Sequence, residues 1–206
     1  MTRNKIFLFI IFAFLVYTGI DTPDRPTWLM EVAPVLIALP FFILTAKSFP
    51  LTPLLYTLLF IHALILIHGG HYTYAEEPFF NWLQSEFNMA RNNYDKVGHL
   101  AQGFIPAILI REILLRKSGI KRGGWLVLVI LLSVMGVSAI YELIEWGAAE
   151  ALGQEADAFL GSQGDVFDTQ KDMFCAGIGG FFALLLLSRR HDKQLHMISG
   201  PFRFKR

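Results

Sequence analysis

The sequence predicts an all-α polytopic membrane protein, built as a bundle of about six transmembrane helices. Of its 206 residues, 54% are hydrophobic and only 17% are charged, whereas soluble proteins carry roughly 25% charged residues. Backbone inside a bilayer must satisfy its own hydrogen bonds, and long apolar runs without period-two alternation do so as helices rather than as a barrel. The single cysteine, Cys175, excludes an internal disulfide framework and a cysteine-rich metal cluster.

Six apolar runs reach or approach the length of roughly 17 to 25 residues that a helix needs to cross the hydrocarbon core. The first run follows Arg3 and Lys5 as in a signal peptide, but no A-x-A-like cleavage pattern follows it, so we expect it to remain as a span. The runs and their loops use the chain as one integral membrane domain over residues 1–206. We expect the spans at about residues 6–20, 29–46, 51–67, 98–115, 125–147 and 172–188.

Basic residues are distributed unequally between the two predicted sides of the membrane. If the N-terminus lies inside, the outer segments hold, of the 18 lysines and arginines, only Arg25, Arg91, Lys96 and Lys171. The positive-inside rule therefore places both termini in the cytoplasm. The formal net charge of the whole chain is only +1, and we expect no nucleic-acid partner.

Acidic residues show the opposite distribution, which the positive-inside rule does not require. Of the 17 aspartates and glutamates, only Glu112 and Asp192 fall on the inner side. The others lie in outer loops or at the outer ends of predicted spans. This excess of acidic residues indicates a functional site on the outer side of the membrane.

The long loop between the third and fourth spans contains a predicted short interfacial helix. Phe80, Leu83 and Phe87 repeat at i, i+3 and i+7 after Pro78, a residue suited to the first helical position. We expect this helix to lie on the outer membrane surface. Simple anchoring and a lid over a neighbouring site are both open interpretations. Earlier in the same loop, Tyr72 is a candidate substrate-binding residue.

The start of the fourth predicted span carries a candidate metal-binding or catalytic motif. Asp95, His99 and Gln102 stand at i, i+4 and i+7 and so share one helix face. A carboxylate and an imidazole one turn apart can share a metal ion, or the carboxylate can orient the imidazole as a base. Taken alone, the motif also fits an acid that favours the helix dipole and an interfacial histidine. Nearby, Arg91 and Lys96 are candidates for attracting an anionic group.

The fifth span ends with two acids one turn apart, Glu142 and Glu145. A charged residue at the centre of a membrane helix costs roughly 2.5 to 3.5 kcal/mol on insertion scales. The cost is smaller near a helix end, but two adjacent acids still favour a protein-lined or wet pocket over lipid. We therefore interpret this pair as part of a site.

The loop before the sixth span adds more acids at the same depth. Asp165, Asp168 and Asp172 stand at i, i+3 and i+7, with Gln170 between them. Helix capping and the helix dipole explain one aspartate at a helix start, but not three. Three separate segments therefore bring acids and a histidine to one side of the membrane.

Such a set can coordinate a divalent metal as cofactor. Carboxylate oxygens suit Mg, Mn or Ca, and a histidine extends the range to Zn or Fe. The candidate ligands are Asp95, His99, Glu142, Asp168 and Asp172. The candidate catalytic residues are His99, Asp95, Glu142 and Glu145. The candidate substrate-binding residues are Arg91, Lys96, Tyr72, Gln102 and Gln170.

The same residues resemble a known family. The motifs His71-Tyr72-x-Tyr74, Arg91-Asn92-x-Tyr94-Asp95-x-x-x-His99, Glu142-x-x-Glu145-Trp146 and Gly164-Asp165-x-x-Asp168-x-Gln170-x-Asp172 resemble those of the YjdF family. This resemblance implies a multi-pass protein of the bacterial inner membrane and supplies no reaction.

Residues 94–180 more distantly resemble the VanZ-like membrane proteins. The shared features are Asp95-Lys96-x-x-His99, a later glutamate at position 142 or 145, and Asp168. Where those proteins have an asparagine four residues after the last aspartate, this chain has Asp172. The substitution adds one negative charge to the region.

Three functional hypotheses follow from these observations. The first is a metal-assisted hydrolase or transferase that acts on membrane lipids or lipid-linked envelope substrates at the outer face. The second is a transporter of protons, cations or a small polar solute, which would need polar residues across the full depth. The inner halves of the last three spans offer only Arg111, Glu112 and a few serines. The third is a scaffold in which the polar cluster only locks the bundle together.

Overall fold

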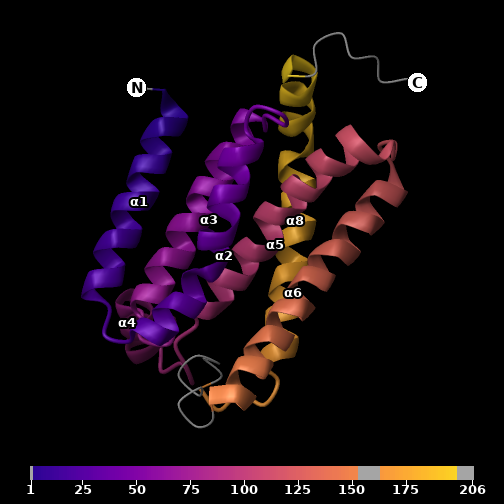
Figure 1. Ribbon diagram of the computed structural model, residues 1–206. Coiled ribbons are helices and arrows are strands. Elements are labelled where there is room, and N and C mark those ends of the chain that lie inside the picture. The colour runs from indigo at the N-terminus through magenta and orange to yellow at the C-terminus, as the bar shows by residue number, and fades with distance from the viewer. Residues whose placement is uncertain (1, 153–162, 199–206) are drawn as a thin grey trace.

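The computed structural model describes residues 2–152 and 163–198, and within them it contains helices and no strands (Figure 1). Six of these helices are long and apolar enough to cross a membrane, which confirms the predicted all-α membrane bundle. The helices are α1 (Arg3–Asp21), α2 (Arg25–Thr45), α3 (Pro53–His71), α4 (Pro78–Glu86), α5 (Tyr94–Ile113), α6 (Gly124–Leu152) and α8 (Asp168–Ile198). A π-helical turn, Leu114–Ser118, continues α5.

The last three long helices extend beyond the apolar runs of the sequence. Helix α5 begins at Tyr94, α6 ends at Leu152, and α8 runs from Asp168 to Ile198. A hydropathy pattern ends where polar residues begin, but these polar residues continue the helices and pack against one another. The predicted short helix is present as α4, where the Glu77 side chain accepts a hydrogen bond from the backbone N–H of Phe80 at 2.8 Å. The position of α4 on the membrane surface stays a prediction.

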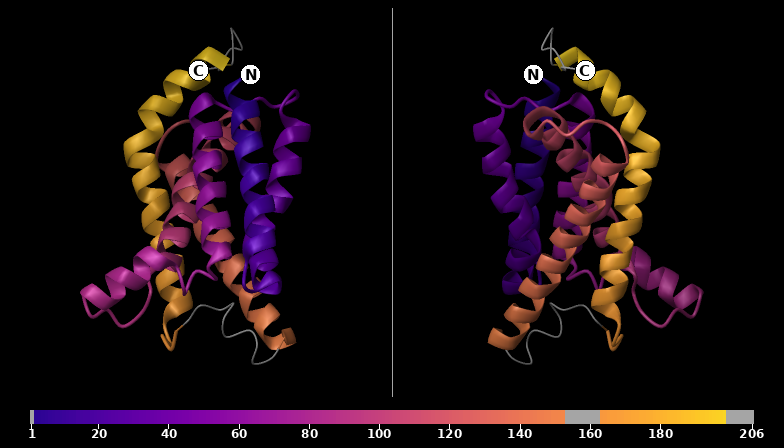
Figure 2. Two further views of the ribbon diagram at one scale, coloured as in Figure 1. Left: turned by 90° about the vertical axis from the view of Figure 1, so that its left-hand side faces the viewer. Right: turned by 90° about the vertical axis from the view of Figure 1, so that its right-hand side faces the viewer.

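Helix α5 lies at the centre of the bundle, against α3, α6 and α8. Helices α1 and α2 both pack on α3. Figure 2 shows the start of α1 and the end of α8 at one end of the bundle. The end of α6, the start of α8 and the sideways-projecting α4 lie toward the other end. The end of the bundle near α4 therefore holds the predicted site residues.

Small residues allow α5 and α8 to approach closely. A Cβ atom at Gly103 would lie 1.8 Å from the carbonyl oxygen of Ala176, and one at Gly179 would lie 2.1 Å from that of Leu100. No side chain fits at either position without moving the helices. The stripe of small residues on the last span thus sets the distance between the two helices that carry the acids.

The surface of the bundle is apolar around its circumference. Large side chains such as Phe12, Ile37, Leu44, Trp125 and Leu185 are exposed. Exposed apolar patches of this kind are unusual in soluble monomers. They match a belt of lipid-facing side chains, as expected for a chain whose spans pass through hydrocarbon.

A buried polar network joins α3, α5 and α8 at the end of the bundle that holds the termini. The carboxylate of Glu112, which is 0% exposed, accepts hydrogen bonds from Thr52 Oγ1 at 2.8 Å and Arg116 Nη1 at 2.6 Å. The guanidinium of Arg111 can only donate, so His191 Nδ1, 2.9 Å away, must accept. His191 Nε2 then carries the hydrogen and donates to Glu112 at 2.9 Å. These groups are fully paired, which indicates a structural role.

Candidate metal centre

Helices α5, α6 and α8 bring acids around one imidazole at the end of the bundle near α4. One ligand atom each of Asp95, His99 and Asp172 lies within 4.8 Å of the others. His99 Nε2 is 3.2 Å from Asp95 Oδ1, 3.9 Å from Asp172 Oδ1 and 3.6 Å from Glu142 Oε1. Three of the other four predicted metal ligands thus surround Nε2 of His99. We call Asp95, His99 and Asp172 the outer cluster.

The other nitrogen of His99 is held by a neighbouring side chain. Its Nδ1 atom lies 3.0 Å from Oε1 of Gln102, one turn further along α5. An amide oxygen only accepts hydrogen bonds, so Nδ1 carries the hydrogen. This leaves Nε2 to face the carboxylates, as in metal sites where the second nitrogen of a ligating histidine donates to an oxygen. Gln102, predicted to bind substrate, here orients His99.

Two basic side chains lie beside the outer cluster and pair with its acids. Lys96 Nζ is 2.6 Å from Asp172 Oδ1 and 3.3 Å from Asp95 Oδ2, and it also bonds to Asp168. Arg91 bonds to Asp168 and lies 3.5 Å from Asp95 Oδ2. Asp168, predicted as a metal ligand, therefore binds both cations. Arg91 and Lys96 were predicted to attract an anionic substrate group. In the structure, both side chains are paired with carboxylates of the protein.

Glu142 contributes a buried oxygen to the site. Its Oε1 atom is buried and has no hydrogen-bond partner within the described residues. A buried acceptor left unpaired costs roughly 1 to 3 kcal/mol, and more when it is charged. The 3.6 Å distance to His99 Nε2 shows that this oxygen points at the outer cluster. A ligand bound there would give it a partner.

The remaining predicted residues have different positions. Glu145 lies one turn beyond Glu142 and is partly buried, and Gln170 is exposed. The ring of Tyr72 packs edge-on against His68 and His71, with centroids 5.2 and 4.5 Å apart. In the part of the chain that the structure describes, neither Tyr72 nor Gln170 contacts the outer cluster.

Three further residues, which were not predicted from the sequence, lie near the site: Glu31, Tyr74 and Tyr141. Glu31, on α2 and only 5% exposed, lies within electrostatic range of Asp95 and His99. The ring of Tyr141 lies 6.1 Å from that of His99. A signal for Glu31 was available, because it is a lone acid inside an apolar run. Tyr74 gave no such signal, since only the fold buries it between α3 and α5.

The loop before α8 is fixed to the start of α5 by polar contacts. The backbone N–H of Asn92 donates to Gln163 Oε1 at 2.9 Å, and the Asn92 side chain donates to Asn81 of α4 at 2.7 Å. Hydrogen bonds from Lys171 and from the backbone of Phe167 hold the pKa of Asp165 below its usual range. The rim of the site therefore carries a charged carboxylate at neutral pH, and Asn81 joins α4 to this rim.

Comparison with known proteins places this architecture in a family. The model of a family described as "Predicted membrane protein (DUF2238)" matches residues 4–193. The chain belongs to this family. It is 50% identical over 181 residues to "Inner membrane protein YjdF" of Escherichia coli (strain K12), an alignment that covers 88% of this chain and 87% of that protein. These matches confirm the predicted family.

The protein is thus a multi-pass protein of the inner membrane. No solved structure matches the chain. The comparisons do not show the more distant resemblance to VanZ-like proteins. The family description names no reaction, so the function must be argued from the site itself.

Proposed function

We propose that this protein is a metal-dependent hydrolase or transferase that acts at the outer face of the inner membrane. The observation that carries the proposal is the convergence of Asp95, His99 and Asp172 within 4.8 Å, with the unpartnered oxygen of Glu142 beside them. Its substrates would be membrane lipids or lipid-linked envelope molecules, because the site lies at the end of membrane-spanning helices.

The charge of the site favours a cation as the bound ligand. The acids Glu31, Glu142 and Glu145 of α2 and α6 add to the aspartates that Arg91 and Lys96 already neutralise. Repulsion among these carboxylates decreases when a divalent cation binds between them. A mixed set of carboxylates and one imidazole suits Mn, Fe or Zn as well as Mg.

The distribution of charge supports an outward-facing site. The basic residues Lys117, Lys121, Arg189 and Arg190 belong to the end of the bundle opposite the outer cluster, where Figure 2 places both described ends of the chain. Under the positive-inside rule that end is cytoplasmic. The predicted basic residues Arg203, Lys205 and Arg206 lie outside the described residues.

The chemistry would follow from the two kinds of group in the site. A divalent cation lowers the pKa of a bound water and polarises the substrate oxygen. Glu142 is placed to accept the proton of that water, and Asp95 and Asp172 would hold the cation with His99 Nε2. The water oxygen would then form a bond to the ester or phosphoester centre, while the bond to the leaving oxygen breaks and that oxygen takes up a proton. For a transferase, an acceptor hydroxyl would replace the water.

Transport is supported less well by the arrangement of polar groups. His99 and Glu112 are 13 residues apart on α5, or about 20 Å at 1.5 Å per residue. Between them α5 presents Gly103, Ile105, Ala107 and Ile108 to the core. Along α5 the described residues therefore form two polar ends separated by apolar packing, and the hydrogen bonds of the inner network are already satisfied.

Metal content of the purified protein tests the proposal. Elemental mass spectrometry should find a stoichiometric divalent metal in wild type and loss of that metal in His99→Ala and in Asp172→Asn, which remove two of the three proposed ligands. His71→Ala is a matched control, since His71 is a buried histidine at the same end of the bundle that contacts Asp21 rather than the outer cluster. This control should retain the metal.

Lipid analysis then tests the enzymatic part. Metal-loaded wild type and His99→Ala would be incubated with a bacterial lipid extract that includes lipid-linked envelope precursors. A product formed by wild type alone would support the proposal. Metal retention without any product would reject catalysis, and a well-folded wild type that binds no added metal would support the scaffold hypothesis instead.

A further inference from the structure

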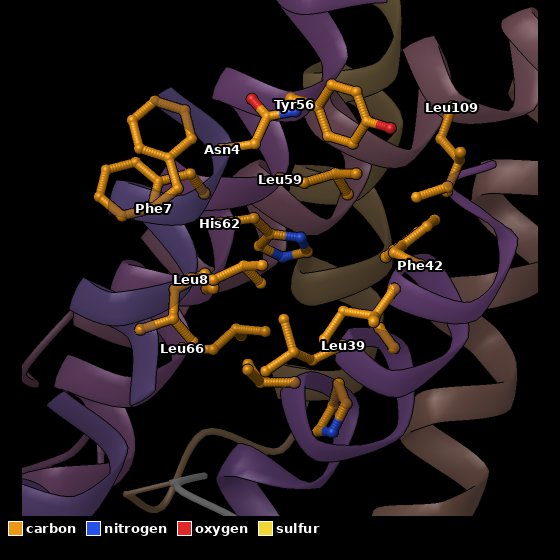
Figure 3. Close-up of a pocket in the computed structure, with 18 of the residues that line it drawn as sticks. Asn4, Phe7, Leu8, Leu39, Phe42, Tyr56, Leu59, His62, Leu66 and Leu109 are labelled. Atoms are coloured by element: carbon orange, nitrogen blue, oxygen red, sulfur yellow. The ribbon is translucent and has the colours of Figure 1, made fainter. Parts of the chain in front are cut away.

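A cavity of about 310 Å³ lies away from the outer cluster, between α1, α2, α3 and α5. Its lining is almost entirely apolar and includes Leu8, Leu39, Phe42, Leu59 and Leu66 (Figure 3). Apolar cavities of this kind stay free of water. An apolar space of this volume inside a bilayer is instead suited to a hydrocarbon group.

One histidine projects into this apolar space. Figure 3 shows the His62 ring in the middle of the apolar side chains that line the cavity. Its Nε2 atom is buried, and the residues of the two described segments provide no hydrogen-bond partner for it. An imidazolium would be strongly disfavoured in such surroundings, so the ring is neutral and offers one donor and one acceptor. An unpaired buried nitrogen destabilises the protein, and a ligand oxygen or hydroxyl would give the imidazole a partner.

The depth of His62 limits the kind of molecule that can reach it. It lies nine residues after Pro53, the start of α3, which is about 14 Å along the helix. The hydrocarbon core of a bilayer is about 30 Å thick, so His62 lies near its middle. The charged head of a phospholipid stays at the surface, and the far part of an acyl chain has no polar atom to offer. A molecule that satisfies His62 must carry its polar atom into the hydrocarbon.

We propose that this cavity binds a neutral lipid with one small oxygen-bearing head, a carbonyl or a hydroxyl, that hydrogen-bonds to the His62 imidazole. A prenyl alcohol and the ring of a lipid quinone both have this chemistry. Helices α1 and α2 both pack on α3 but make few contacts with each other, so a lipid would enter from the bilayer between them. This site is distinct from the outer cluster, because none of Asp95, His99 and Asp172 lines the cavity.

Binding of two probes to the delipidated protein tests this proposal. Farnesol and a decyl-substituted benzoquinone would be compared with an anionic phospholipid, phosphatidylglycerol, by thermal unfolding and native mass spectrometry. We expect at least one neutral probe to raise the unfolding temperature and to remain bound, and the phospholipid to do neither. The probe that binds identifies the source of the oxygen.

The variant His62→Leu keeps an apolar side chain of similar size and removes the nitrogen. We expect it to bind the probe about tenfold more weakly, as loss of one hydrogen bond predicts. His68→Leu is the matched control, because His68 is a histidine of the same helix outside the cavity, paired with Glu77 at 3.0 Å. This control should bind as wild type does.

A second variant keeps the test decisive if His62→Leu does not fold. Ala38→Phe adds a ring from the α2 wall of the cavity and should abolish binding of either probe by occupying the space. Equal binding by wild type, His62→Leu and Ala38→Phe would overturn the proposal, and so would failure of both probes to bind wild type. Metal content of the outer cluster should be unchanged in both cavity variants.

Discussion

His99 Nδ1 lies 3.0 Å from Gln102 Oε1, so the neutral side chain of Gln102 determines which nitrogen of the imidazole points toward the acids. The hydrogen bond sets the proton on Nδ1 and directs Nε2 toward Asp95, Asp172 and Glu142. Without it the ring would be free to turn its protonated nitrogen toward the carboxylates. The i, i+3 spacing on α5 thus prepares the histidine for binding a cation.

Gln102→Leu should therefore weaken metal binding while leaving the bundle folded. Loss of a partner that orients a ligating histidine costs about 10- to 100-fold in metal affinity. Titration of the metal-free protein with Mn²⁺ or Zn²⁺ would measure the change. Gln170→Leu is the control, because Gln170 is exposed and should show wild-type affinity. Equal affinity of wild type and Gln102→Leu would mean that Gln102 does not orient the ligand.

Gly103→Ala and Gly179→Ala should each separate α5 from α8. Their new Cβ atoms would lie 1.8 Å from the carbonyl oxygen of Ala176 and 2.1 Å from that of Leu100. Overpacking of this kind destabilises proteins by about 1 to 3 kcal/mol. Because α8 carries Asp172 and α5 carries His99, metal retention should decrease as well. Thermal unfolding and metal content would report the two effects.

Gly136→Ala provides the control for these variants. A Cβ atom at Gly136 would meet nothing within 4 Å, so this substitution should leave the unfolding temperature unchanged or slightly higher. Alanine is the better helix former, so if Gly136→Ala destabilised the protein as much as Gly103→Ala does, the close contact between α5 and α8 would not explain the result.

Glu112→Leu should be among the most destabilising substitutions in the chain. It leaves Arg116 and His191 without their carboxylate partner in a buried site, and breaking a buried ion pair from one side costs about 3 to 5 kcal/mol. Unfolding in detergent at increasing denaturant would measure the loss. Glu86→Leu, at the exposed end of α4, should have little effect. A stable Glu112→Leu protein would show that the network does not hold α3, α5 and α8 together.

Labelling of single cysteines tests the predicted orientation. In a Cys175→Ser background, which removes the only cysteine, Gln170→Cys should react in intact spheroplasts with a thiol reagent that cannot cross the membrane. Lys117→Cys, at the opposite end of the bundle and exposed, should react only after the membrane is opened. The reverse pattern would place the outer cluster in the cytoplasm and reject the proposed substrate side.

The apolar runs allowed the fold class to be predicted because hydrocarbon selects helices before any tertiary contact forms. The same runs predicted the bounds of α5, α6 and α8 too short. Hydropathy stops at the first polar residues, whereas the helices continue through Tyr94, Asp168 and the residues after Gly147. The reason for α5 and α8 is that Tyr94 and Asp168 are buried in the bundle, so tertiary contacts hold these helices together beyond their apolar runs.

The sequence by itself determined the membrane architecture, the family and the set of acids at one end of the spans, because length, hydropathy and helical spacing are local properties. Tertiary structure alone decided which of those residues meet. It placed Asp172 beside His99 through the contact at Gly103 and Gly179, and it paired Asp168 with the two cations. It also brought Glu31 to the site from a helix more than sixty residues earlier in the chain. Such distances depend on how helices pack, which no local pattern encodes.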